Sequence, residues 1–517
     1  MIKNVIVIVL VVLSLNSLSA QVKDRPFPYA LSLTGNTKPD EIDEHIENAP
    51  TGTDRYTKDG IVLTEDQVEF SFSGFYLNEI EFPSNHGIIV EFSYAMADGK
   101  KYGNSYGDGI SMFLFDGQKD FSIGAPGASL GYANKNTSVG NQPGLNGAYL
   151  GLGLDVFGSY KLRGNNVNER REGIDGLTYK NETNHITLRG GQYKNDRYKG
   201  YPVLFTEQVE YGNESRPNIA SASLNYNTGD YQTSTYSTPG FSELRTGYYF
   251  GDTYNYNRVE AKLIPINNGA NGMKVSVFIK SERSSATKYP IRDFIYPNSF
   301  KTRDENGTIY NYETQVPSIF KVGFAGGTGG ATQTQIIKDV VVNLPYAPIT
   351  QDRDMLLCLT NGDDKNNSQS IVSPFSLDTF YVGTIDNPSS QQGERNVDVT
   401  SFRFEDENGF NINTGTRMDS NFYIVEYRQS GIGLWEYYYD RRLGNTPANY
   451  LYFTPETNNL PEGDYSVYYS AHSKDDGSNG PFAEHIYRCR PTKITVKARV
   501  CSAVVNPNLP IKVLLEE

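Results

Sequence analysis

The stretch "GAYLGLGLDVFGSY", residues 147–160, alternates small and aliphatic residues and then places a single carboxylate, Asp155, in their midst. Such a nearly continuous apolar run is typical of a strand that is buried on both faces. An ionised carboxylate is costly to bury unless a charge, a metal ion or hydrogen-bond donors compensate it. Asp155 is therefore expected to have a specific partner.

The rest of the chain repeats the strand pattern of this stretch. Aromatic residues make up 13% of the sequence, with 38 Tyr against one Trp, and glycine is abundant. Tyrosine and β-branched residues gather in short alternating runs such as "GIIVEFSYAM", "NRVEAKLIPI" and "MKVSVFIKS", separated by Gly, Asn and Asp. These features indicate an all-β protein, and the number of runs favours a large sandwich over a small barrel.

The chain divides into four predicted segments. Residues 1–20 have a basic start, an apolar run and a small-residue end, which is typical of a secretory signal peptide; the apolar run is too short to span a bilayer. Residues 21–345 are predicted to form the large sandwich, 346–385 a linker or long loop, and 386–517 a smaller β domain. The expected location is secreted or at the cell surface, without a transmembrane segment after cleavage.

Charge and cysteine content narrow the possible partners. There are 47 Lys and Arg residues against 60 Asp and Glu residues, a formal net charge of −13, which argues against nucleic acid and anionic membranes as partners. Of the three cysteines, Cys489 and Cys501 could form one disulfide, which would leave Cys358 as a buried thiol or as the mate of another chain.

Four segments, taken in order, carry a resemblance to a known family. They are "YGDGISMFLFDG" (106–117), "GAPGASLGYA" (124–133), the opening stretch, and "PSIFKVGFAGGTGGATQTQIIKDVVV" (317–342). Together they resemble the L-type (legume-lectin-like, concanavalin-like) lectin domains of secreted bacterial surface proteins. The resemblance implies a jelly-roll β-sandwich that binds glycans or polysaccharides without cleaving them, as in adhesion. The C-terminal segment more weakly resembles an immunoglobulin-like module.

The resemblance also implies a carbohydrate site. In the family, the Asp of the Asp-Gly motif accepts hydrogen bonds from sugar hydroxyls, often across a cis peptide; here this residue is Asp108, after Gly107. A backbone N–H of the glycine-rich loop, near Gly131, would be a second contact. Alternatively, Asp108 caps a turn and the glycines are structural. The other residues assigned to sugar contact are Gly109, Tyr132, Phe157, Ser159, Gly327 and Thr328, with the loop from Gly326 to Gly330.

The family's metal site gives Asp155 a candidate role. By resemblance, Asp155 matches a shared metal-ligating Asp and Phe157 a residue whose carbonyl ligates Ca²⁺. Gly153 stands where the family has Glu and Ser159 where it has Asn, while His185 in "NHITLRG" matches the family's His only loosely. These departures argue against a transition metal bound by Asp155, Phe157, Ser159 and His185.

Two alternatives for Asp155 stay open at this point. Calcium takes oxygen ligands, and these could come from Asp155, the Phe157 carbonyl and loop residues such as Asn165, Asn166 or Asp175. In the other alternative, Asp155 accepts hydrogen bonds from neighbouring backbone and needs no ion.

Enzymatic activity is not expected. Glycosidases with a similar sandwich place two glutamates around a central Asp on one strand, and retaining chemistry needs two carboxyl groups about 5 Å apart. Here Gly153 and Phe157 occupy the flanking positions. The "FAGGTGGAT" loop lacks the Gly-Lys-[Ser/Thr] ending of a phosphate loop. An alternative function is a lectin-fold surface component that binds other surface proteins, or is purely structural, without sugar binding.

Overall fold

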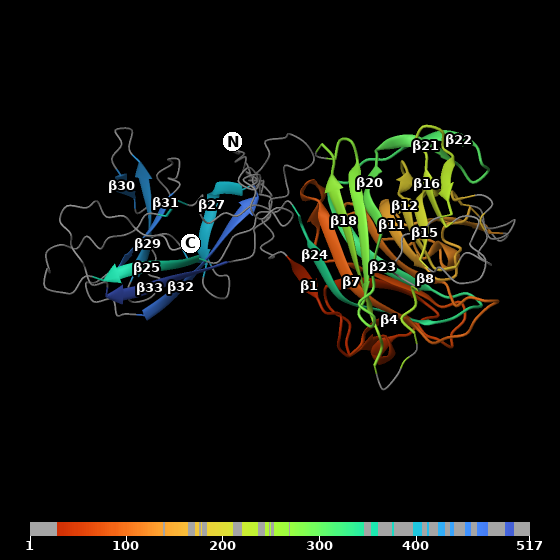
Figure 1. The fold of residues 1–517 in the computed structure, drawn as a ribbon, viewed down its shortest axis with the longest axis horizontal. Coiled ribbons are helices and arrows are strands. Elements are labelled where there is room, and N and C mark those ends of the chain that lie inside the picture. The colour runs from red at the N-terminus through yellow and green to blue at the C-terminus, as the bar shows by residue number, and fades with distance from the viewer. Residues whose placement is uncertain are drawn as a thin grey trace, which may run out of the picture. The chain divides into compact units, whose positions relative to one another are not determined.

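The computed structural model describes residues 28–345 apart from 138–139, 164–170, 175–176, 178–182, 210–219, 236–242, 248, 250–252 and 268, and beyond residue 352 it describes strands only. The chain separates into two compact units, one of which spans Phe27–Tyr346 (Figure 1). The described part of this larger unit consists of strands and loops with three single-turn 3-10 helices: η1 (Gly52–Asp54), η2 (Ser84–His86) and η3 (Gly127–Ser129).

One large sheet of the unit contains ten strands, and every pairing in it is antiparallel. Its order is β17 (Tyr231–Ser234), β16 (Ser221–Leu224), β15 (Val203–Gln208), β12 (His185–Gly190), β11 (Ala148–Asp155), β8 (Gly109–Asp116), β23 (Ile319–Gly327), β5 (Phe72–Leu77) and β2 (Ile42–Glu47), with β6 (Phe82–Pro83) pairing beside β5 on β23.

The second large sheet contains eight strands. Its order is β20 (Thr287–Tyr296), β19 (Met273–Ser281), β18 (Asn257–Pro265), β7 (Ile88–Ala97), β24 (Thr334–Asn343), β4 (Gly60–Thr64) and β3 (Tyr56–Thr57), with β1 (Tyr29–Leu31) pairing on β24. Three small hairpins complete the unit: β9 (Lys135–Thr137) with β10 (Gly140–Gln142), β13 (Gln192–Tyr193) with β14 (Asp196–Gly200), and β21 (Ser299–Arg303) with β22 (Ile309–Glu313).

The two large sheets pack face to face through aromatic side chains. The ring of Phe92 on β7 lies 5.0 Å from that of Phe324 on β23, and the ring of Tyr149 on β11 lies 5.1 Å from that of Tyr296 on β20. Such buried rings supply much of the apolar area that stabilises a sandwich. The predicted all-β class and large concanavalin-like sandwich are confirmed for this unit.

The glycines of β11 explain the opening stretch. Side chains alternate between the faces of a strand, so residues 151, 153 and 155 share one face. A Cβ at Gly151 would lie 2.5 Å from the Tyr132 ring, and a Cβ at Gly153 would lie 2.3 Å from the Tyr160 ring. Each glycine thus leaves the space that a tyrosine ring occupies, and a second apolar layer covers the sheet on this face.

The smaller unit contains two further sheets. A five-stranded sheet has the order β25 (Arg353–Leu359), β33 (Thr492–Val500), β32 (Gly463–Ser473), β27 (Val397–Glu405) and β28 (Asn411–Ile412), and a four-stranded sheet has the order β26 (Phe375–Ser376), β31 (Tyr450–Pro455), β29 (Phe422–Gln429) and β30 (Trp435–Tyr438).

The structure places two of these strands inside the segment predicted as a linker. β25 pairs in parallel with β33 over its whole length, and β26 pairs with β31. The short run "RDMLLCL" of β25 lacks the alternation on which strand prediction relies. The immunoglobulin-like assignment stays a prediction. The signal peptide, the polar stretch 360–374, Cys489 and Cys501 lie outside the described residues, as does the side chain of Cys358.

Candidate functional site

One row of the ten-stranded sheet brings the predicted site residues together. At the end of β11, Asp155 pairs with Gly109 of β8 on one side and with His185 of β12 on the other. Gly109 pairs in turn with Gly327 of β23. Residues far apart in the sequence therefore meet at one edge of the sheet, where the loops after β11 and β23 and the loop before β8 emerge.

Asp108 lies at the centre of this edge. Its peptide bond with Gly107 is cis, as the resemblance implies. Its backbone N–H donates to the Gly327 carbonyl at 2.7 Å, and its own carbonyl accepts from the Phe157 N–H at 3.0 Å. The Phe157 ring packs on Gly107, since a Cβ there would lie 3.1 Å from Cδ2 of the ring. The backbone of Asp108 is thus fixed by both neighbouring loops.

The carboxylate of Asp108 faces two glycines. A Cβ at Gly127 would lie 3.5 Å from its Oδ2, and a Cβ at Gly329 would lie 3.7 Å from its Oδ1. Gly127 has a φ of +65°, a conformation that favours glycine, and the same Cβ position lies 3.7 Å from the Lys135 ammonium. Gly127 and Gly329 themselves therefore add no side chain beside the carboxylate, and Asp108 as a whole is 7% exposed.

Gly131 and Tyr132 belong to the glycine-rich loop and make hydrogen bonds within the protein. The Gly131 N–H donates to the Ala125 carbonyl at 2.9 Å. Tyr132 is fully buried, and its hydroxyl donates to the Gly190 carbonyl at 3.0 Å. The assignment of Gly131 and Tyr132 as sugar contacts stays a prediction.

Thr328 anchors its loop. Its side chain is buried; the Oγ1 donates to the Val68 carbonyl at 2.9 Å and accepts from the Ser71 N–H at 2.9 Å. The Thr328 N–H donates to the Ser71 carbonyl at 2.8 Å. The Thr328 hydroxyl therefore holds the loop after β23 in place and is already engaged within the protein.

Two exposed aromatic residues flank the same loop, and sequence reasoning missed both. Phe70 is 70% exposed, and its N–H donates to the Gly329 carbonyl at 3.1 Å. Tyr102 is 61% exposed, and its Cδ2 would lie 3.3 Å from a Cβ at Gly330. The backbone of Phe70 and the ring of Tyr102 are consequently close to the loop that faces Asp108.

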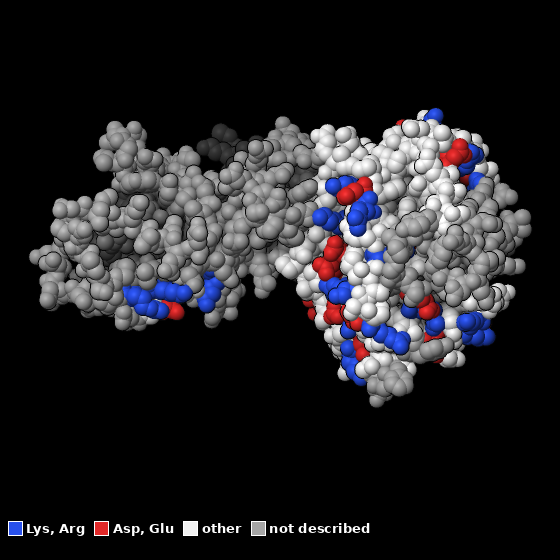
Figure 2. All heavy atoms as spheres, in the orientation of Figure 1, with Lys and Arg blue, Asp and Glu red and all other residues white. Residues whose placement is uncertain are grey.

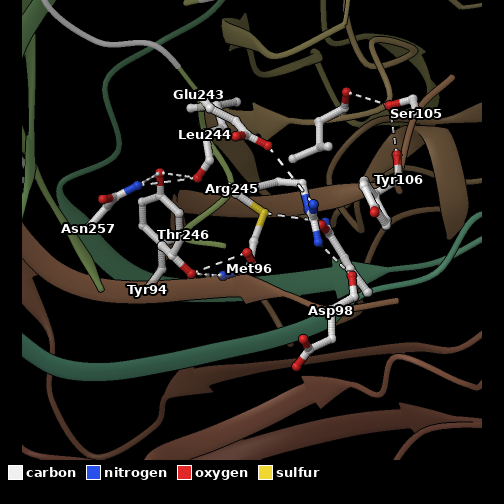
Figure 3. A network of polar contacts seen from close by, with 12 residues as sticks. Tyr94, Met96, Asp98, Ser105, Tyr106, Glu243, Leu244, Arg245, Thr246 and Asn257 are labelled. Atoms are coloured by element: carbon white, nitrogen blue, oxygen red, sulfur yellow. Dashed lines mark hydrogen bonds and ion pairs between the residues drawn. The ribbon is translucent and has the colours of Figure 1, made fainter. Parts of the chain in front are cut away.

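The segment before Asp108 rests on a buried arginine (Figure 3). The guanidinium carbon of Arg245 lies 3.4 Å from the centre of the Tyr106 ring, a cation–π contact, and Nη2 donates to the Asp98 carbonyl at 2.6 Å. On the other side, the Ser105 hydroxyl donates to the Val156 carbonyl at 3.0 Å. These contacts fix the approach to Asp108.

The segment that carries Arg245 is itself tied to β7. The Tyr94 hydroxyl donates to the Leu244 carbonyl at 3.0 Å, and the Thr246 N–H donates to the Met96 carbonyl at 2.9 Å. Figure 3 shows Arg245 reaching from this segment toward Tyr106. Through Arg245, the eight-stranded sheet thereby supports the segment with Tyr106, which leads into β8 of the ten-stranded sheet.

Asp155 has the partners that its burial requires. It is 1% exposed, and its Oδ1 accepts from the Gly158 N–H at 2.8 Å while its Oδ2 accepts from the Tyr160 N–H at 2.6 Å. Burial raises the pKa of the Asp155 carboxyl, and the charge of Lys161 acts most strongly in the opposite direction. Asp155 therefore caps the loop that follows it.

His185 and Ser159 are buried beside this carboxylate. Burial, followed by the charges of Lys161 and Lys288, lowers the pKa of His185 well below its usual value, so the ring is neutral at pH 7. Its Nδ1 lies 3.0 Å from the Thr206 hydroxyl. Within the described residues, His185 Nε2 and Ser159 Oγ have no hydrogen-bond partner.

The described residues around Asp155 do not fit a metal ion. The Tyr160 ring takes the place of the missing glutamate at Gly153, and the positive charge of Lys161 acts on both Asp155 and His185. Among the described residues, no three His, Cys, Asp or Glu side chains gather in a way that could hold a metal. Of the two alternatives for Asp155, the contacts favour hydrogen bonding to backbone. Asn165, Asn166 and Asp175 lie outside the described residues.

Comparisons with known proteins give structural matches only. No family model and no curated protein matches the sequence. The solved structures that match include legume lectins and L-type lectin domains. The exoplasmic/lumenal domain of VIP36 in a Ca²⁺/Man3GlcNAc-bound form is 12% identical, with 60% of this chain and 89% of that chain covered and a TM-score of 0.31. Peanut lectin with a 9mer peptide is 15% identical, with 60% and 96% covered and a TM-score of 0.29.

A third match is the metal-free carbohydrate-recognition domain of Emp46p, which is 11% identical, with 61% of this chain and 95% of that chain covered and a TM-score of 0.31. The assignment of the fold rests on the sheets and their register, described above.

The face of the larger unit that Figure 2 shows carries no broad field of one charge. In Figure 2, acidic and basic side chains are interspersed on the visible face of the larger unit. On this unit's eight-stranded sheet, for example, Arg258 pairs with Glu91 at 2.7 Å. No helix among the described residues is long and apolar enough to cross a membrane.

Proposed function

We propose that this protein binds glycans non-covalently at the edge of the ten-stranded sheet, with Asp108 as the central acceptor. The observation that carries the proposal is the position of the Asp108 carboxylate, which lies beside the glycines Gly127 and Gly329 where the loops meet at the edge of the sheet. A fixed carboxylate forms strong, directed hydrogen bonds with hydroxyl groups, and a sugar ring presents adjacent hydroxyls. The Gly327 carbonyl and Phe157 N–H hold the Asp108 backbone in place for this contact.

The two exposed rings complete a surface suited to a sugar. One face of a pyranose ring is lined with C–H groups, which pack on aromatic rings. The Phe70 N–H binds the Gly329 carbonyl and the Tyr102 ring adjoins Gly330, so either ring could pack on a sugar whose hydroxyls reach Asp108. Aromatic side chains combine a large apolar area with few rotatable bonds and are well suited to this role.

A groove beside the glycine-rich loop offers room for a longer glycan. Its volume is about 390 Å³, and its lining includes Phe72, Ala125 and Pro126 together with His45 and Arg197. The groove is thus lined by polar and charged as well as apolar residues. An oligosaccharide or polysaccharide therefore suits the site better than a single sugar.

The location and the biological setting follow from the sequence. The leader at residues 1–20 supports secretion or display at the cell surface, where a glycan binder would act as a lectin or adhesin. The absence of the flanking glutamates around Asp155 in the sequence supports binding without cleavage. Incubation with bound glycans should then release no new reducing ends.

The test is a glycan array followed by titration of any glycan that binds. Asp108→Asn keeps the shape of the side chain but removes its charge, and we expect it to weaken binding at least about tenfold, or about 1.4 kcal/mol. The matched control is Asp293→Asn, an exposed aspartate on β20 of the other sheet, which should bind as the unmodified protein does. Equal binding by Asp108→Asn would refute the proposed site.

A second candidate function is a lectin-fold surface component that binds protein or is structural. The engaged N–H of Gly131 and the buried side chain of Tyr132 favour it, because both were expected sugar contacts. An array without any bound glycan, obtained with protein shown to be folded, would favour this candidate.

A further inference from the structure

The loop after β11 has its carbonyl oxygens occupied by donors from the protein itself. The Lys161 ammonium, fully buried, donates to the Gly158 carbonyl at 2.7 Å. The Gly158 N–H donates to Asp155 at 2.8 Å. The backbone of Gly158 therefore lies between the buried Asp155 carboxylate and the buried Lys161 ammonium. Its N–H dipole points to the carboxylate and its carbonyl dipole to the ammonium.

Arg171 supplies donors to the same loop and joins it to another. It is 2% exposed; Nη2 donates to the Ser159 carbonyl and Nε to the Leu162 carbonyl at 3.0 Å. Its Nη1 donates to the hydroxyl of Ser129 at 3.1 Å, and Ser129 belongs to η3 in the glycine-rich loop. A single guanidinium thus links two of the loops around Asp108.

Arg189 on β12 is the third buried cation. Its Nε donates to the Tyr160 carbonyl at 2.9 Å and its Nη2 to the Leu162 carbonyl at 3.3 Å. Its guanidinium carbon lies 4.9 Å from the centre of the Tyr160 ring. The remaining carbonyl, that of Lys161, accepts from the Ile174 N–H at 3.1 Å. Each carbonyl oxygen from residue 158 to residue 162 therefore already has a donor.

We propose that Lys161, Arg171 and Arg189, here termed the cation cluster, hold the loop after β11 in place and do so without a bound Ca²⁺ ion. Calcium needs about six to eight oxygen ligands, and the carbonyls of residues 158–162 accept from charged or backbone donors. The charge of Lys161 also repels a second cation near Asp155. The cluster connects Asp155 to the glycine-rich loop. The positive charges that hold the site in place therefore belong to side chains of the protein and not to a bound ion.

The inference concerns the same site as the proposed function, but its test does not require a sugar. Thermal unfolding of the mature protein is measured after metal removal, with millimolar Ca²⁺ and with excess chelator, and bound calcium is measured by elemental analysis. An ion bound only by the folded state raises the unfolding midpoint. We expect superimposable curves and no stoichiometric calcium. A midpoint that falls in chelator and recovers with Ca²⁺ would overturn the proposal.

Two variants test the cluster directly. Lys161→Met removes the charge and keeps much of the side-chain length, and Arg171→Lys keeps the charge but loses the planar set of donors. Both should lower the unfolding midpoint by several degrees with no recovery in Ca²⁺, whereas the control Arg258→Met, on the outer face of the other sheet, should change it little. Recovery of either variant in Ca²⁺, or midpoints equal to the control's, would contradict the cluster's role. If a variant fails to fold, the calcium measurements on the unmodified protein still decide the proposal.

Discussion

At the scale of single residues, the glycines of β11 matter as much as its one carboxylate. Gly151 and Gly153 each lie under a tyrosine ring, and Asp155, next on the same face, accepts from the backbone of residues 158 and 160. The pattern Gly-Leu-Gly-Leu-Asp thus describes one face of a strand on which two aromatic rings and a loop are packed.

Gly153→Ala should destabilise the protein. The new Cβ would lie 2.3 Å from the Tyr160 ring, and relieving such overpacking in a core costs about 1–3 kcal/mol. Urea unfolding would show a lower midpoint with an unchanged slope. Gly329→Ala is the matched control, because its Cβ would contact nothing nearer than Asp108 Oδ1 at 3.7 Å. It should leave stability unchanged and weaken glycan binding; an equal loss of stability in both variants would argue against the packing explanation.

At the scale of strands and loops, the site consists of loops that meet at one edge of a sheet. The segment with Phe70 is bound to the loop after β23 by the Thr328 side chain, and the segment with Tyr102 adjoins it through the hydrogen bond from the Thr332 N–H to the Lys100 carbonyl, at 2.9 Å. The exposed rings are consequently carried by anchored backbone, which positions them for stacking on a ligand.

Phe70→Ser and Tyr102→Ser should each weaken glycan binding by about three- to tenfold without changing the unfolding midpoint. The reason is that each ring is exposed, so its loss removes contact with the ligand and little of the core. Titration with the array-selected glycan measures the change. Ile295→Ser, an exposed apolar residue on β20, is the control. If neither ring matters, the sugar does not lie across the loop after β23.

The sequence predicts strands and motifs better than it predicts their contacts. The alternating runs at 88–97, 257–265 and 273–281 all form strands, and the cis peptide before Asp108 that the resemblance implies is present. The partners of Arg171 could not be found, because Ser129 is 42 residues away and only the fold brings it close. Phe70 has a φ of +54° between two strand segments, and no local pattern indicates that its ring is displayed.

At the scale of the whole molecule, the larger unit encloses ionisable groups that its two sheets must stabilise. Lys288 of β20 and Glu207 of β15 form a buried ion pair across the two sheets at 2.6 Å. Glu172 is also buried; its carboxylate accepts from the Tyr310 hydroxyl at 2.7 Å, and burial raises its pKa to about 8. The free energy of unfolding should therefore depend on pH through the titration of buried Glu172.

The expected pH dependence has a definite sign. Because the pKa of Glu172 is about 8 in the folded state and near 4.5 in the unfolded state, the folded protein binds more protons between these values. The contribution of Glu172 to stability is then lost as pH rises from about 5 to 8, at up to roughly 1 kcal/mol per pH unit. Glu172→Gln keeps the hydrogen-bond acceptor but does not titrate, so urea unfolding across this range should show a flatter profile for the variant. Parallel profiles would mean that Glu172 is ionised in the folded protein.

The link that Arg171 makes between the glycine-rich loop and the loop after β11 has a consequence for the energetics of recognition. Two loops fixed to one another before a ligand arrives lose little conformational entropy when it binds, so more of the contact energy remains as affinity. Free and occupied forms of the site should then superimpose closely, and association should proceed without a slow rearrangement step. Severing the link, as in Arg171→Lys, would transfer the cost of ordering both loops to the moment of binding.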